Sequence, residues 1–108
     1  MTTQLVKFKD FNHYTSEINQ FVFMFDKHYK SYIENKEQSW EVNFSMLDGL
    51  IRENNREVKI TETKYWDKPW QYSAPAHIYQ FKYVRICVYV NHNNLLEIGD
   101  YFEIIINK

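Results

Sequence analysis

The sequence predicts an α+β fold, in which a long N-terminal helix packs against an antiparallel sheet of three to five strands within one compact domain, residues 1–108. Two patterns carry this prediction. Apolar residues recur at helical spacing from about residue 13 to 36, and two β-rich runs near the C-terminus flank a short asparagine-rich segment. With 44% hydrophobic residues and only two glycines and two prolines, the chain can bury a core and does not resemble a disordered one.

The N-terminal helix is predicted from one stripe of apolar and aromatic side chains spaced three and four residues apart. The stripe consists of Tyr14, Ile18, Phe21, Val22, Phe25, Tyr29, Tyr32 and Ile33. Asp10 or Asn12 is the candidate N-cap, since both side chains accept hydrogen bonds from the first helical amides. The preceding residues 5–8 are predicted to form either a short strand or an extended arm.

A long C-terminal β-hairpin is predicted to join residues 78–90 to residues 95–106 through a turn at residues 91–94, because asparagine tolerates positive φ. Placing Val90 opposite Leu95 brings Arg85 opposite Asp100, and it also brings Lys82 opposite Glu103. This register predicts one core face to which both runs contribute: Phe81, Tyr83, Arg85, Cys87 and Tyr89 from the first, and Leu96, Ile98, Asp100, Phe102 and Ile104 from the second. It leaves a second apolar face, a candidate dimer surface, made of Val84, Ile86, Val88 and Tyr101.

Within the second run of the hairpin, Gly99 is expected to mark a bulge or a close backbone approach.

The middle of the chain is predicted to hold a short strand at 40–44, a short helix at 46–53 and an outer strand at 56–66. Ser45 and Asp48 resemble a capping box at the start of that helix, and the alternative is one continuous strand over residues 40–52. Residues 56–66 alternate, but their apolar side is thin and their charges would protect a sheet edge.

The connection that follows, residues 67–76, is the predicted binding surface. It holds two prolines, which stiffen it, and two large aromatic residues, with Trp66 just before it; such residues offer contact area at low entropic cost. The predicted partner-binding residues are Trp66, Lys68, Trp70, Tyr72, His77 and Glu97. The alternative is that the aromatic residues fold back and cap the sheet.

The sequence holds no metal, phosphate or nucleophile motif, so we expect no cofactor, no metal and no enzymatic activity. The single cysteine, Cys87, excludes a disulfide framework and is predicted to be a small core residue in a cytoplasmic protein. Neither a signal-peptide pattern nor a membrane-spanning apolar run is present. The net charge of −1 offers no basic footprint for duplex nucleic acid.

These observations favour a small protein-binding module, such as a bacterial or phage inhibitor that blocks a partner protein by steric occlusion. A toxin-immunity protein or an anti-defence protein of the anti-CRISPR type has such a profile. The alternative is a protein that binds single-stranded nucleic acid and stacks bases on Tyr79, Phe81 and Tyr83 of the sheet. A homodimer is also possible, and no membrane partner is expected.

Overall fold

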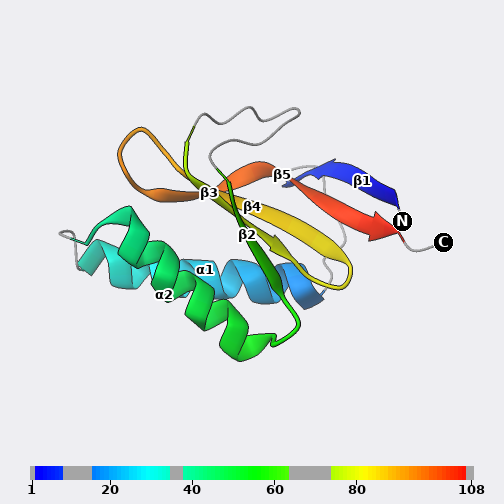
Figure 1. Ribbon diagram of the computed structural model, residues 1–108, viewed down its shortest axis with the longest axis horizontal. Helices are drawn as coiled ribbons and strands as arrows, with labels where there is room; N and C mark the ends of the chain where they lie inside the picture. Colours follow the sequence, from blue (N-terminus) through cyan, green and yellow to red (C-terminus); the bar gives the residue numbers. More distant parts are fainter. Residues whose placement is uncertain (1, 9–15, 35–37, 64–73, 107–108) are drawn as a thin grey trace.

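A computed structural model describes residues 2–8, 16–34, 38–63 and 74–106, which form two helices and a five-stranded antiparallel sheet (Figure 1). Chain order is β1 Thr2–Lys7, α1 Ser16–Glu34, α2 Trp40–Asn54, β2 Lys59–Thr63, β3 Ala76–Gln80, β4 Val84–Val90 and β5 Leu96–Ile106. The order of strands across the sheet is β1-β5-β4-β3-β2. The α+β class with an antiparallel sheet is therefore confirmed, and a second full helix is added to it.

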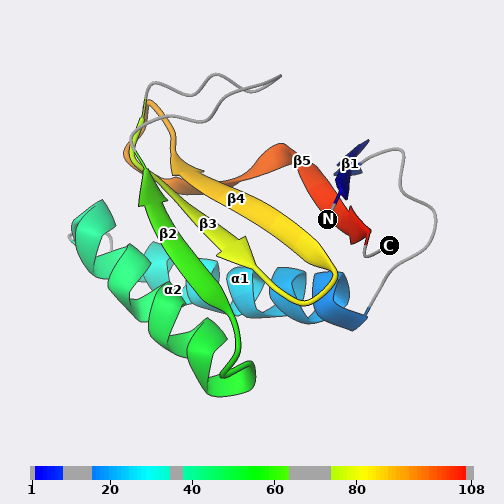
Figure 2. The ribbon, with the colours of Figure 1, turned by 45° about the vertical axis from the view of Figure 1, so that its right-hand side comes forward.

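Both helices lie on the same face of the sheet, as Figures 1 and 2 show from two directions. The core lies between the two layers, where apolar side chains of both helices meet those of β3, β4 and β5. Its largest fully buried members are Tyr79, Phe21, Phe44 and Phe102. Burial of such rings supplies the main favourable free energy of the fold.

Helix α1 follows a strand rather than opening the chain, and it spans Ser16–Glu34 within the described residues; the expected ends at 13–15 and 35–36 lie outside them. The strand alternative for the preceding residues is confirmed, because β1 pairs with β5 at the sheet edge. The apolar stripe faces the sheet as predicted, with Ile18, Phe21 and Phe25 buried. The candidate caps Asp10 and Asn12 lie outside the described residues.

Helix α2 corrects both predictions made for residues 40–53. The segment is one helix, Trp40–Asn54, and its N-cap is Ser39, whose Oγ accepts a hydrogen bond from the backbone N of Val42 at 3.3 Å. Ser45 lies inside the helix and does not cap it. The alternation of Trp40, Val42 and Phe44 was misleading, because the buried side of the segment follows the helical period.

The predicted first strand of the hairpin, residues 78–90, is two strands. β3 ends at Gln80, and a tight turn closed by a hydrogen bond from Phe81 N to Val84 O leads into β4. Glu17 at the start of α1 accepts hydrogen bonds from the backbone N of Lys82 (3.2 Å) and of Tyr83 (3.0 Å). A side chain distant in sequence therefore satisfies the turn amides, which explains why no local turn signal marks the break.

The second turn lies at residues 91–94 as predicted, with Asn94 at φ 62° and with Asn91 Oδ1 accepting from the backbone N of Asn93 and of Leu95. The predicted register, however, is wrong. Val90 lies opposite Leu96, and beyond a register shift Arg85 lies opposite Glu103, to which it forms a 3.6 Å ion pair, instead of opposite Asp100. The shift falls across from residues 99–101, where Gly99 had indicated a bulge.

The predicted core face is therefore wrong for β4, whereas Phe81, Leu96 and Phe102 are buried in the core as predicted. Val84, Ile86 and Val88 are fully buried against the helices, so they do not form a dimer surface. Arg85, Cys87 and Tyr89 alternate with them and point to the other face of the sheet, where Cys87 packs with Ala76, Ile78, Tyr89 and Tyr101. The expected outer strand is confirmed, because β2 forms one edge of the sheet.

Candidate functional site

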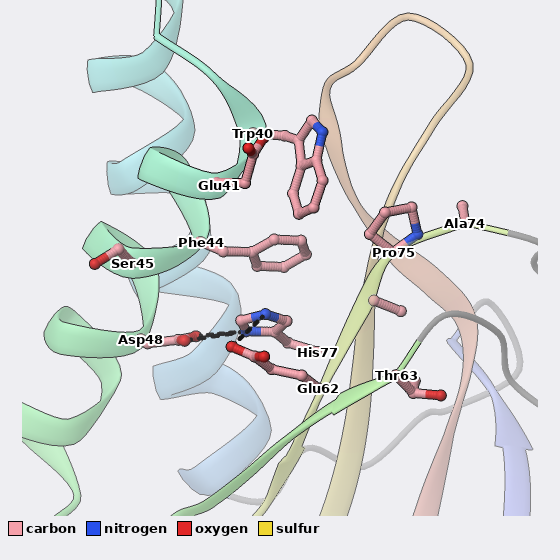
Figure 3. A pocket seen from close by; sticks show the side chains of 11 residues that line it. Trp40, Glu41, Phe44, Ser45, Asp48, Glu62, Thr63, Ala74, Pro75 and His77 are labelled. Carbon is pink, nitrogen blue, oxygen red and sulfur yellow. Dashed lines mark hydrogen bonds and ion pairs between the residues drawn. The ribbon is translucent and has the colours of Figure 1, made fainter.

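A pocket of about 860 Å³ opens between α2 and the end of the sheet formed by β2 and β3 (Figure 3). Helix α2 contributes residues of its first turns, and the strands contribute their facing ends. The lining residues are Trp40, Glu41, Phe44, Ser45, Asp48, Glu62, Thr63, Ala74, Pro75, Ala76 and His77. The pocket therefore combines an aromatic side with several carboxylates and one imidazole.

Asp48 lines the pocket and makes hydrogen bonds or ion pairs to two other buried side chains. It lies on the buried side of α2, in line with Phe44 and Ile51, and its carboxylate reaches across to β3. Its Oδ1 accepts a hydrogen bond from the Tyr79 hydroxyl at 2.6 Å, and its oxygens lie 3.0 and 3.1 Å from His77 Nδ1. Because a carboxylate accepts and does not donate, Nδ1 carries a proton in this contact.

His77 is held in one orientation by three neighbours. Asp48 binds its Nδ1, and the Phe44 ring stacks on the imidazole with centroids 3.9 Å apart and planes 10° from parallel. Glu62 lies opposite His77 in the β2–β3 pairing and places Oε1 3.6 Å from Nε2. Figure 3 shows the imidazole between the Asp48 and Glu62 carboxylates. The His77 ring thus links the buried carboxylate to one at the surface.

Burial controls the proton equilibria of two further groups near Asp48. Desolvation, reinforced by the charge and the hydrogen bond of Asp48, raises the pKa of Tyr79 well above its usual value, so its hydroxyl remains a donor. Desolvation also lowers the pKa of His28 on α1, and the charge of Asp48 opposes that effect in part. His28 Nε2 is buried without a hydrogen-bond partner in the described part of the chain.

The arrangement can orient an imidazole and present carboxylates, but among the described residues no serine or cysteine side chain points at the imidazole. The Ser45 side chain points away from His77 in Figure 3. Burial raises the pKa of the Cys87 thiol to about 12, and Cys87 packs on the other face of the sheet. No cluster of three or more metal-ligating side chains occurs within residues 2–8, 16–34, 38–63 and 74–106. In the same ranges, no helix is long and apolar enough to cross a membrane.

The predicted site residues are only partly assigned by the structure. Trp66, Lys68, Trp70 and Tyr72 lie outside the described residues. His77 does line the pocket, but as a buried side chain tied to Asp48. Glu97 is exposed, accepts a 3.3 Å hydrogen bond from Asn91 Nδ2, and pairs with Tyr89 on the face away from the helices. The structure therefore does not bring Glu97 into the pocket.

Sequence reasoning missed Asp48 as a site residue and treated Glu62 as a solvated edge charge. A signal for Asp48 was present, because Trp40, Phe44 and Asp48 are four residues apart and an acid on an apolar helical stripe needs a buried partner. That signal requires residues 40–54 to be read as one helix. No local signal identifies Glu62, because its position beside His77 depends on the β2–β3 register.

The base-stacking face proposed for nucleic acid is largely inside the protein. Tyr79 and Phe81 are buried in the core, where both pack against Phe21. Tyr83 is the exposed member of the three.

Comparison of the chain with protein-family models, with curated proteins and with solved structures finds no match.

Proposed function

We propose that this protein is a binding module that attaches to a partner protein and blocks it by steric occlusion, as an immunity or anti-defence inhibitor does. The observation that carries the proposal is that the predicted binding segment adjoins the pocket in the sequence at both of its ends. Thr63 and Ala74, the residues that flank segment 64–73, both line the pocket. The described residues on either side of the predicted anchors Trp66, Trp70 and Tyr72 therefore both lie at the pocket.

The chemistry of the rim supports binding to a protein. A concave site with aromatic walls and a few charged groups suits the anchor side chains of a partner. The rim holds Trp40 and Pro75 beside exposed Glu41 and Glu62. Such a mixture of apolar area and surface charge is typical of protein interfaces.

The test is affinity capture of the tagged protein from nuclease-treated lysate of the cells in which it occurs, or of the organisms they antagonise. We expect one stoichiometric protein partner, whose own activity falls when the complex forms. The double variant Trp70→Ala and Tyr72→Ala should lose this partner while its melting temperature stays within a few degrees of the parent's, since a binding anchor contributes little to folding.

The matched control is Tyr83→Ala, which removes an exposed ring at the turn between β3 and β4, the opposite end of β3 from the pocket. This variant should retain the partner. The proposal is wrong if capture depends on intact nucleic acid, or if the double variant binds like the parent. Loss of partners after nuclease treatment would favour the single-stranded nucleic-acid alternative.

A further inference from the structure

We infer that the pocket between α2 and β2–β3 receives a basic side chain of the partner, with arginine fitting best. The inference rests on the proposed function and names the chemistry of its contact. It follows from three properties of the pocket: the sign of its charge, the rings beside that charge and the availability of its outer carboxylates.

The described lining of the pocket carries mainly acidic side chains. Its lining residues include three carboxylates, Glu41, Asp48 and Glu62, whereas the described lining contains no lysine or arginine. His77 offsets at most one of these charges when it is protonated. Carboxylates grouped around a concave, partly apolar surface attract a cation more strongly than they would in open solvent.

The rings explain why a flat cation fits better than a compact one. Trp40 packs edge-on against Phe44, with centroids 6.1 Å apart, and Phe44 stacks on His77. Figure 3 shows this column of three rings along the α2 side, with Pro75 across from it. A guanidinium stacks on aromatic faces while its edge donates to carboxylates, whereas an ammonium is a hydrated point charge. The volume of about 860 Å³ leaves ample room for such a side chain.

The two outer acids are available to pair with it. The Glu62 side chain is 81% exposed and contacts His77 Nε2 at 3.6 Å, a distance that a closer cation would improve on. Glu41 is exposed in the first turn of α2. Asp48 differs, because its oxygens already bind Tyr79 and His77, so it adds negative charge without being the direct partner. Glu62 and Glu41 are therefore the expected pairing residues.

The experiment titrates the isotopically labelled protein with Nα-acetyl-arginine methylamide and follows amide and indole signals by NMR. We expect binding with a Kd on the order of millimolar, since a single side chain contributes only part of an interface. The shifts should centre on the Trp40 indole and on the amides of Glu62, Thr63 and Ala76. The citrulline analogue, which has the same shape without the charge, should produce much smaller shifts.

Variants then separate the pocket charges from the overall charge. Glu62→Gln and Glu41→Gln should each weaken the arginine probe by up to about fivefold, the size expected for an exposed ion pair. Glu57→Gln makes the same charge change on an exposed residue outside the pocket and should have no effect. Equal binding of the arginine and citrulline probes, or shifts that centre elsewhere, would overturn the inference.

A second test of the inference measures binding of the captured partner protein to variants of the pocket. If the inference is correct, the double variant Glu41→Gln and Glu62→Gln binds that partner at least several-fold more weakly than the parent, whereas Glu57→Gln does not. Undiminished partner binding would overturn the inference but leave the proposed function standing. Failure to capture any protein would instead reject the proposed function, and the probe titration would still report on the pocket.

Discussion

At the scale of single residues, the buried polar network of Asp48, His77 and Tyr79 links α2 to β3. A carboxylate this deeply buried is tolerated only when its oxygens are bonded. Here one oxygen receives the Tyr79 hydroxyl and both lie near His77 Nδ1. The network therefore supports the fold and, in the same place, orients the imidazole that lines the pocket.

Replacing Tyr79 with phenylalanine should destabilise the protein by about 1.5–3 kcal/mol, the range for a hydrogen bond to a charged group. The ring remains in the core, so the loss comes from the hydroxyl and from the Asp48 oxygen left without its 2.6 Å donor. Urea denaturation followed by circular dichroism measures the change. Tyr83→Phe, made at an exposed tyrosine, should leave stability unchanged. An equal effect of both substitutions would show that the hydrogen bond from Tyr79 to Asp48 does not stabilise the fold.

His28 should make stability depend on pH near neutrality. Burial lowers its pKa in the folded state below the ordinary value of 6.5, so the unfolded chain binds the proton more readily. Its contribution is therefore complete above pH 6.5 and is lost as the pH falls through the folded-state value. Unfolding free energies of the parent and of His28→Gln, measured from pH 7.5 to 5.5, should converge at the acidic end. Parallel curves would contradict this assignment.

At the scale of elements, α2 supplies all the described helical residues that line the pocket, and the position of its first turn determines which residues face the strands. With Ser39 as N-cap, the positions of Phe44, Leu47 and Ile51 turn toward the core, and Asp48 lies among them. A helix that began at Ser45 would provide neither Trp40 nor Phe44 as ring walls. The cap is therefore a determinant of the site as well as of the helix.

Ser39→Ala should lower stability by about 1 kcal/mol, because Ser39 Oγ accepts from a first-turn amide that would otherwise lack a partner. Ser45→Ala is the matched control: the residue is exposed within the helix, and alanine has the higher helix propensity, so stability should stay constant or rise by up to about 0.5 kcal/mol. Thermal denaturation of the two variants distinguishes these outcomes. A larger loss from Ser45→Ala would place the start of the helix at Ser45.

At the scale of the whole molecule, the sheet carries both helices on one face, and its other face carries a smaller apolar cluster. Cys87 lies in the central strand β4 within that cluster and is almost fully buried. The side chains of this cluster pack around Cys87, so a reagent reaches its thiol only when they move apart.

The reaction of Cys87 with a thiol reagent should therefore be slow in the native protein and fast once this cluster has opened. Its pKa of about 12, against 9.0 for a free thiol, reduces the thiolate fraction about a thousandfold, and burial blocks access as well. We expect labelling at pH 8 to be more than about a hundredfold slower in the native protein than in urea. The chain has one cysteine, so the signal has one source. Rapid native labelling would show that this face opens locally.

Local patterns were sufficient for the α+β class, for the apolar stripe of α1, for the turn at residues 91–94 and for the outer position of β2. Each depends on contacts between residues close in sequence: helical spacing, asparagine at positive φ, or charges along an edge. The predicted strand boundaries and register were wrong where contacts between residues distant in sequence determine them. Glu17 supports a turn about 65 residues away, and the bulge near Gly99 changes which side chains of β4 enter the core.

For the candidate site, too, some features follow from the local sequence and others only from the tertiary structure. By itself the sequence determined that the chain carries aromatic residues around two prolines and that His77 follows them, because composition and order are local facts. Only the tertiary structure decided that His77 meets Asp48, 29 residues earlier, and Glu62 on the neighbouring strand. The physical reason is register: the pairing of β2 with β3 and the packing of α2 on the sheet bring these charges together, and no spacing along the chain encodes either.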